Sequence, residues 1–230
     1  MPGKNSIKQY LENSYYHLYN RGVEKRLIFL DEQDYSVFLS YLKEYLLPKN
    51  TTQLYDTISN PNSSWREKDK ANKLLRMNNF FGKITLLSYC LMPNHFHLLV
   101  KQASANSIDV FMNSLATRYT MFFNKKYKRV GALYQAQYKA VIVSSDEQLL
   151  HLSRYFHFQS LASQGNALRS WKAQQPSSYP EYLWKRKTEW VKPEEILSFF
   201  SKSNPKLSYK SFVESSDQDL SPIAKVVIEN

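Results

Sequence analysis

Two histidines separated by one residue have the type and spacing in this sequence that best suit metal chemistry. His95 and His97 flank Phe96 within an apolar segment that is typical of a β-strand. Because strand side chains alternate between faces, both imidazoles point the same way and Phe96 points into the core. Two residues rise about 6.6 Å along a strand, so both rings can reach one metal ion at about 2.1 Å each. The alternative is a pair of ordinary surface histidines, and the triplet alone does not decide between the two.

A second candidate set lies on a predicted helix that begins at the N-cap Ser145 and runs to about residue 162. Tyr155 and Gln159 are four residues apart, so they share one helix face. A tyrosine hydroxyl can act as a covalent nucleophile when a metal or a base activates it, and a glutamine carbonyl oxygen can coordinate a metal. The chain contains 17 tyrosines, most of which must pack in the interior, so simple packing is the alternative role for Tyr155.

A basic stretch without acidic residues extends from Asp109 to Asp146. Lysine and arginine can hold phosphates there while the interleaved aromatic rings stack on unpaired bases. The nucleic-acid contacts expected in this stretch are Arg118, Lys125, Lys126, Lys128, Arg129, Tyr138 and Lys139. A solvated helix end beside ordinary core aromatics is the alternative interpretation.

The composition favours the nucleic-acid interpretation and excludes several classes. The 230 residues include 31 Lys and Arg against 20 Asp and Glu, a net charge of +11, which favours a polyanionic partner over a basic membrane-surface role. No apolar run is long enough for a transmembrane helix, and the charged N-terminal sequence shows no hydrophobic region of the kind found in signal peptides. The single cysteine, Cys90, forbids an internal disulfide and suits a reducing cytoplasm. We therefore expect a cytoplasmic, nucleoid-associated protein without a membrane partner.

The predicted elements are a mixture of strands and helices, with two strands in succession in the middle of the chain. Strands are expected at 14–20, 84–91, 95–100 and 133–143, and helices at 32–47, 66–77, 107–127 and 145–162, with a turn at 92–94, a loop at 49–65 and a short helical run at 193–200. This order predicts an α+β fold with an antiparallel sheet and helices on one face. We expect a catalytic domain at 1–165, in which 49–78 is an insertion and a candidate mobile segment, and a basic, aromatic extension at 166–230.

Several motifs in a fixed order resemble the single-tyrosine HUH transposases, and in particular the REP-associated tyrosine transposases. They are Tyr16-His17-Leu18-Tyr19-Asn20-Arg21-Gly22, Leu91-Met92-Pro93-Asn94-His95-Phe96-His97-Leu98-Leu99-Val100, Gly131-Ala132-Leu133-Tyr134-Gln135-Ala136-Gln137-Tyr138-Lys139-Ala140, Tyr155 with Gln159, and a weaker match at Pro176-Ser177-Ser178-Tyr179-Pro180-Glu181-Tyr182. The resemblance covers roughly 14–182, interrupted by 49–78. The chain departs from the family, in which Asn-Pro usually follows shortly after the tyrosine, because the stretch Phe158-Gln159-Ser160-Leu161 contains no proline.

The resemblance implies a ferredoxin-like fold and a specific chemistry. It implies that His95 and His97 bind a divalent metal, Mg²⁺ or Mn²⁺, with Gln159 as third ligand. Tyr155 would attack single-stranded DNA near a hairpin and leave a 5′-phosphotyrosine and a free 3′-OH. Arg21, in the first motif, joins the expected DNA contacts. A non-catalytic DNA- or RNA-binding protein and a water-using metal nuclease stay open as alternatives, as does the choice between monomer and homodimer.

Overall fold

Four strands form a single antiparallel sheet in the computed structural model, which describes residues 10–162, 176–215, 221–224 and 227. The strands are β1 (Ser14–Arg21), β2 (Ile84–Met92), β3 (His95–Gln102) and β4 (Lys139–Val143). Their order across the sheet is β2-β3-β1-β4, and each neighbouring pair is antiparallel. This confirms the predicted α+β class, and the strand order is consistent with a ferredoxin-like sheet.

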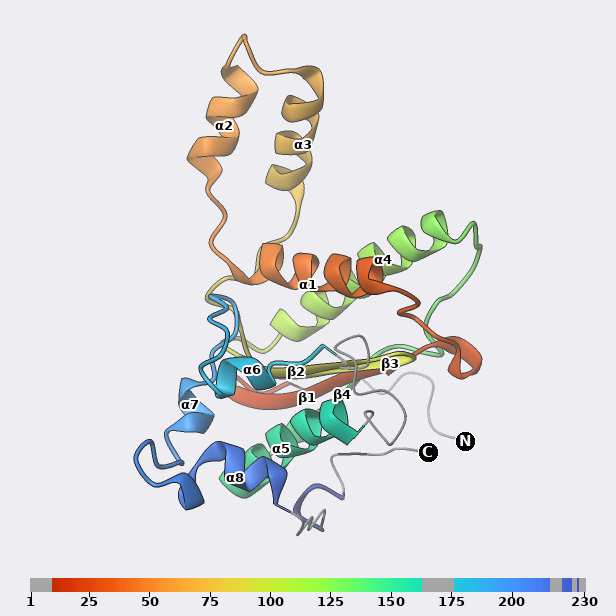
Figure 1. The fold of residues 1–230 in the computed structure, drawn as a ribbon. Helices are drawn as coiled ribbons and strands as arrows, with labels where there is room; N and C mark the ends of the chain where they lie inside the picture. Colours follow the sequence, from red (N-terminus) through yellow and green to blue (C-terminus); the bar gives the residue numbers. More distant parts are fainter. Residues whose placement is uncertain (1–9, 163–175, 216–220, 225–226, 228–230) are drawn as a thin grey trace.

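Two long helices cover one face of the sheet (Figure 1). They are α1 (Glu32–Leu46) and α4 (Ser107–Lys126). Helix α1 begins where the sequence predicted, because the Asp31 side chain accepts from the backbone N–H of Asp34 and completes a capping box. Alternate strand residues such as Leu18, Phe96 and Leu98 point into the core beneath these helices.

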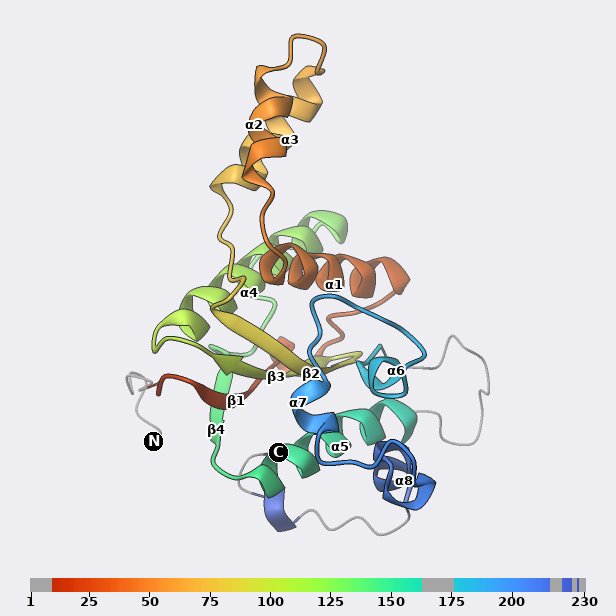
Figure 2. The same ribbon diagram turned by 90° about the vertical axis from the view of Figure 1, so that its left-hand side faces the viewer.

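The opposite face is covered as well, by α5 (Asp146–Ala162) and the shorter C-terminal helices (Figures 1 and 2). The sequence led us to expect helices on one face only, and this detail was wrong. The reason is that the central strands are apolar on both sides. Leu87 and Leu99 point into a second core that includes Leu152 and Phe156 of α5.

Much of the described part of the C-terminal region packs on this second face. Its elements are α6 (Tyr179–Tyr182), α7 (Glu194–Leu197), η3 (Pro205–Leu207), α8 (Tyr209–Glu214) and η4 (Ser221–Ile223). Ser177 bridges to Cys90 of β2, and the ring of Tyr182 packs in the second core. The division of the chain at residue 165 stays a prediction.

Residues 51–76 form a helical arm that projects from the body on the α1 side (Figures 1 and 2). It consists of α2 (Thr51–Ser59) and α3 (Trp65–Arg76), which pack mainly on each other. The predicted loop at 49–65 was therefore wrong for α2. Asn50 caps this helix, and its weak apolar pattern is stabilised by α3, a tertiary contact that composition does not reveal.

The strand predicted at 133–143 is shorter than expected. Only Lys139–Val143 pairs with β1 as a regular ladder. The preceding residues are held by separate bonds near the end of β1, because Gln135 N–H donates to Arg21 O and Val23 N–H donates to Leu133 O. Val23 lies in the short helix η1 (Val23–Lys25). Among the described helices, none is long and apolar enough to cross a membrane.

Candidate active site

Strand pairing gathers polar side chains on the α5 face, at one end of the sheet. Arg21 lies opposite His95 and Tyr19 lies opposite His97 in the β1–β3 pair, while Tyr19 lies opposite Lys139 in the β1–β4 pair. Directly opposed residues of an antiparallel pair share a face. The two histidines therefore lie on the same surface as two cationic side chains that come from the neighbouring strands.

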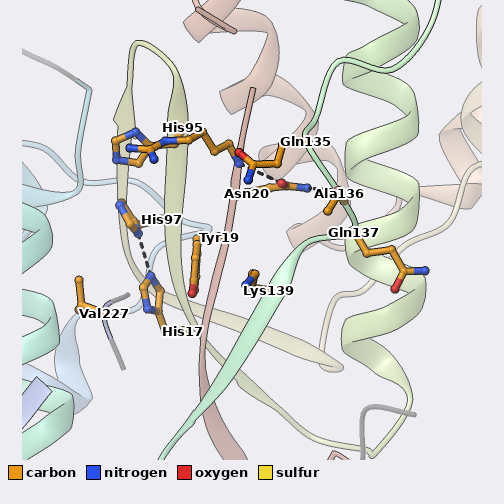
Figure 3. Close-up of a pocket in the computed structure, with 11 residues that line it drawn as sticks. His17, Tyr19, Asn20, His95, His97, Gln135, Ala136, Gln137, Lys139 and Val227 are labelled. Carbon is orange, nitrogen blue, oxygen red and sulfur yellow. Dashed lines mark hydrogen bonds between the residues drawn. The ribbon is translucent and has the colours of Figure 1, made fainter. Parts of the chain in front are cut away.

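These side chains line a cleft of about 260 Å³ (Figure 3). Its lining residues are His17, Tyr19, Asn20, Arg21, His95, His97, Gln135, Ala136, Gln137, Lys139 and Val227. The two predicted metal ligands lie on one strand, and Lys139 lies across the Tyr19 ring from them. The cleft therefore combines imidazoles, amides and cations, which suits a phosphate-bearing ligand.

Hydrogen bonds orient both histidines of the triplet. His95 Nδ1 lies 2.6 Å from Asn94 Oδ1, and this oxygen can only accept, so Nδ1 carries a proton and, in the neutral ring, Nε2 keeps its lone pair. His97 Nδ1 lies 2.8 Å from His17 Nε2. The His95 and His97 rings are 4.8 Å apart and nearly perpendicular, and both Nε2 atoms are buried.

The electrostatics of the cleft keep His97 neutral. Its side chain is only 3% exposed. Burial lowers the pKa of His97 well below its usual value, and repulsion from Arg21 and from the protonated forms of His17 and His95 acts in the same direction. A neutral imidazole is the form that coordinates a metal, so the environment favours the form that the proposed site requires.

Helix α5 brings the Tyr155 ring next to His97, although neither Tyr155 nor Gln159 is among the residues that line the cleft. The Ser145 hydroxyl caps this helix as predicted, accepting from Gln148 N–H at 3.1 Å. The Tyr155 ring lies 6.0 Å from the His97 ring, edge on. Gln159 Nε2 donates to the Tyr155 hydroxyl oxygen at 2.5 Å, and Gln159 Oε1 is buried. One member of each pair singled out in the sequence thus comes into contact, Tyr155 with His97, and Gln159 is hydrogen-bonded to Tyr155.

The residues present fit a divalent cation. The described residues contain no group of three or more His, Cys, Asp or Glu side chains placed to hold a metal, so an ion here needs other ligands as well. His97 Nε2 is buried and makes no hydrogen bond with any described residue. Two imidazole nitrogens and the Gln159 oxygen suit Mg²⁺ or Mn²⁺ when phosphate oxygens and water complete the coordination shell.

The predicted DNA contacts divide into two groups. Arg21 and Lys139 line the cleft. Arg118 lies elsewhere, on α4, where its guanidinium pairs with Glu44 at 2.6 Å and lies 3.7 Å from the centre of the Tyr41 ring. The structure therefore brings two of the cations to the histidines and holds this third one against α1.

The other predicted contacts on α4 and beyond it also lie outside the cleft. Lys126 pairs with Asp31 at 2.7 Å and with Asp34 at 2.8 Å. Arg129 donates to Asn124 Oδ1 at 2.9 Å, while Lys125 and Lys128 are exposed. Tyr138 is 5% exposed and donates its hydroxyl to Asp109, so its ring lies in the core and offers no open face to a base.

Several residues of the site were not singled out in the sequence. They are His17, Tyr19, Asn20, Asn94 and Gln135. The signal for two of them was present, because His17 and Tyr19 alternate with Arg21 along β1 and so share its face. What the sequence could not supply was the pairing of this strand with β3, which turns a shared face into a shared site.

Comparison with known proteins finds one family model that matches part of the chain. Residues 64–159 match the family described as "Transposase IS200 like". The match confirms the resemblance to the tyrosine transposases and supports an enzyme that binds and transposes DNA. No curated protein matches the chain.

Two solved structures are similar in outline. One is a REP-associated tyrosine transposase bound to a REP hairpin, with 7% identity and a TM-score of 0.47 over 82% of this chain and 96% of that one. The other, provisionally described as a transposase from Deinococcus radiodurans R1, has 15% identity and a TM-score of 0.35 over 67% and 94% of the two chains. At these scores we draw the function of the chain from neither.

Proposed function

We propose that this protein cleaves and rejoins single-stranded DNA through a covalent bond to Tyr155, acting on DNA that carries a hairpin. The observation that carries the proposal is the position of Tyr155, whose ring lies beside His97 and whose hydroxyl oxygen accepts from Gln159. A nucleophile must lie next to the groups that bind the reacting phosphate. Here it lies next to a histidine that lines a cationic cleft.

The reaction exchanges one phosphodiester for another. The Tyr155 oxygen attacks the phosphorus and loses its proton, while the bond from phosphorus to the 3′ oxygen breaks and that oxygen takes up a proton. The products are a 5′-phosphotyrosine and a free 3′-OH. Attack by a 3′-OH on the phosphotyrosine reverses the step and joins strands without a nucleotide cofactor. This agrees with the absence of a Walker or dinucleotide motif from the sequence.

The chain's own residues assist the attack in two ways. The Gln159 amide donates to the Tyr155 oxygen, so it stabilises the negative charge that develops there as the proton leaves. Arg21 and Lys139, which line the cleft, would hold the phosphates on either side of the reacting group. The cations would thereby place the strand for an in-line attack.

The metal proposed for this site would be held by His95 and His97 through Nε2 and by Gln159 through Oε1. When bound, such an ion polarises a phosphate oxygen and neutralises charge at the scissile group. Removal of the ion by EDTA is therefore expected to stop cleavage and to leave most of the DNA affinity intact, because phosphate contacts also come from the cations of the chain.

A denaturing gel tests the proposal. The protein is incubated with a library of hairpin-bearing single strands and Mn²⁺, and covalent adducts are trapped. The attached DNA is sequenced, and peptide mapping identifies the modified tyrosine. Tyr155→Phe keeps the ring but removes the attacking oxygen, so it is expected to bind DNA and form no adduct. The matched control is Tyr19→Phe, a change at the other tyrosine of the site, which should still form the adduct.

Three other results would each select a different function. Cleavage without adduct indicates a water-using nuclease, and binding without cleavage indicates a non-catalytic DNA-binding protein. An adduct mapped to a tyrosine other than Tyr155 overturns the assignment of the nucleophile.

A further inference from the structure

We propose that His17 is a positioning residue that fixes the tautomer of His97. In this arrangement His97 Nδ1–H donates a hydrogen bond to His17 Nε2, and the lone pair of His97 is thereby kept on Nε2 for a divalent cation. The inference rests on the proposed function, because it assigns a role toward the proposed metal. Its first test uses the metal-free protein, so this inference and the proposed function can fail separately.

The geometry around His17 is that of a fixed support. His17 is fully buried, and its Nε2 lies 2.8 Å from His97 Nδ1. The two rings stack at 5.0 Å and 30°. Tyr19 stacks on His17 at 4.6 Å, and Phe156 of α5 packs against it at 5.1 Å. Contacts from both the sheet and the helix therefore hold this ring in one orientation.

When both rings are neutral, two proton arrangements can form the bond between them. In one, His97 Nδ1–H donates to His17 Nε2, which leaves a lone pair on His97 Nε2. In the other, His17 Nε2–H donates, and the proton of His97 then lies on Nε2. That second arrangement buries an N–H which finds no acceptor among the described residues, and buried donors without acceptors are rare in proteins. The first arrangement leaves a lone pair that a cation can accept.

The neighbouring histidine supports the same assignment. His95 Nδ1 lies 2.6 Å from Asn94 Oδ1, an oxygen that can only accept. His95 is therefore held with its proton on Nδ1. His17 occupies for His97 the place that Asn94 occupies for His95. A hydrogen bond from the second ring nitrogen is the usual device that orients metal-binding histidines.

The first experiment assigns the tautomers directly. The ¹⁵N-labelled, metal-free protein is studied by long-range ¹H–¹⁵N correlation NMR, which distinguishes Nδ1–H from Nε2–H in each of the five histidines. We expect His97 in the unchanged protein as the Nδ1–H tautomer. Finding its proton on Nε2 overturns the inference, whatever the protein does with metal or DNA.

The second experiment measures Mn²⁺ affinity by calorimetry. His17→Phe keeps a ring of similar size but removes the acceptor, and we expect it to weaken Mn²⁺ binding by about 10–100-fold. His17→Gln restores an acceptor oxygen at a similar reach and should recover most of that loss. His151→Phe, at a histidine that packs on Phe212 outside the cleft, is the control and should bind like the unchanged protein.

The outcomes separate the two proposals. A His17→Phe protein that keeps its near-ultraviolet circular dichroism and binds Mn²⁺ at full affinity overturns the positioning role. Equal weakening of Mn²⁺ binding in His17→Phe and His17→Gln also counts against the positioning role. Only a role that depends on the hydrogen-bond acceptor predicts that Gln restores binding and Phe does not. If the unchanged protein binds no Mn²⁺, the metal proposal fails and the role of His17 toward a metal fails with it, even where NMR confirms the hydrogen bond.

Discussion

Replacing the two cations of the cleft is expected to flatten the salt dependence of DNA binding, whereas replacing Arg118 is not. Arg21 and Lys139 line the cleft, while Arg118 is paired with Glu44 and lies over Tyr41. Each cation that contacts a phosphate of a single strand contributes about −0.7 to the slope of log affinity against log salt. The double variant Arg21→Gln, Lys139→Gln should therefore lose about 1.4 of that slope.

The difference is large enough to measure. Between about 50 and 200 mM salt, log salt rises by about 0.6, so the unchanged protein should lose about 7-fold more affinity than the double variant. The assay is fluorescence anisotropy of a labelled hairpin-bearing strand in EDTA, which prevents metal-dependent cleavage. Arg118→Gln is the matched control and should keep the original slope. A flattened slope in Arg118→Gln with none in the double variant would refute the reasoning and place the DNA on α4.

Three further predictions concern stability and accessibility. Burial raises the pKa of the Cys90 thiol, so a thiol reagent at pH 8 should modify it only after denaturation; rapid modification of the native protein contradicts its burial. Lys126→Met leaves the buried Asp34 carboxylate without its cation, so urea unfolding should show a free energy of unfolding lower by about 3 kcal/mol. The control Lys125→Met, at an exposed position, should lower it by less than about 0.5 kcal/mol. Replacing 51–76 with a short flexible linker should leave the body folded by near-ultraviolet circular dichroism, because α2 and α3 pack mainly on each other; loss of that signal would show that the arm supports the core.

Local chemistry made most elements predictable from the sequence. Asp31 and Ser145 each cap the helix that follows, as expected from their side chains. The turn at 92–94 joins two antiparallel strands, because proline and asparagine favour a change of chain direction there. The two-residue period of a strand also predicted that His95 and His97 share a face. These features depend on neighbours within a few residues, which the sequence displays directly.

Contacts between distant residues were decided only by the tertiary structure. The sequence marked Arg118 and Lys126 as DNA contacts because both are cationic, yet their acidic partners lie 74 or more positions away along the chain. It marked Tyr138 as a stacking ring, and the fold buries that ring. Charge and aromaticity are properties of a residue, but exposure and pairing depend on what packs against it.

The sequence by itself determined the strand with two histidines, the helix with its tyrosine and glutamine, and the cationic character of the chain. Only the fold decided that these meet, since α5 crosses the sheet face on which β1 and β3 present their polar side chains. His17 shows the reason most clearly. It lies 80 positions from His97, so no local spacing could reveal the hydrogen bond that strand pairing creates between them.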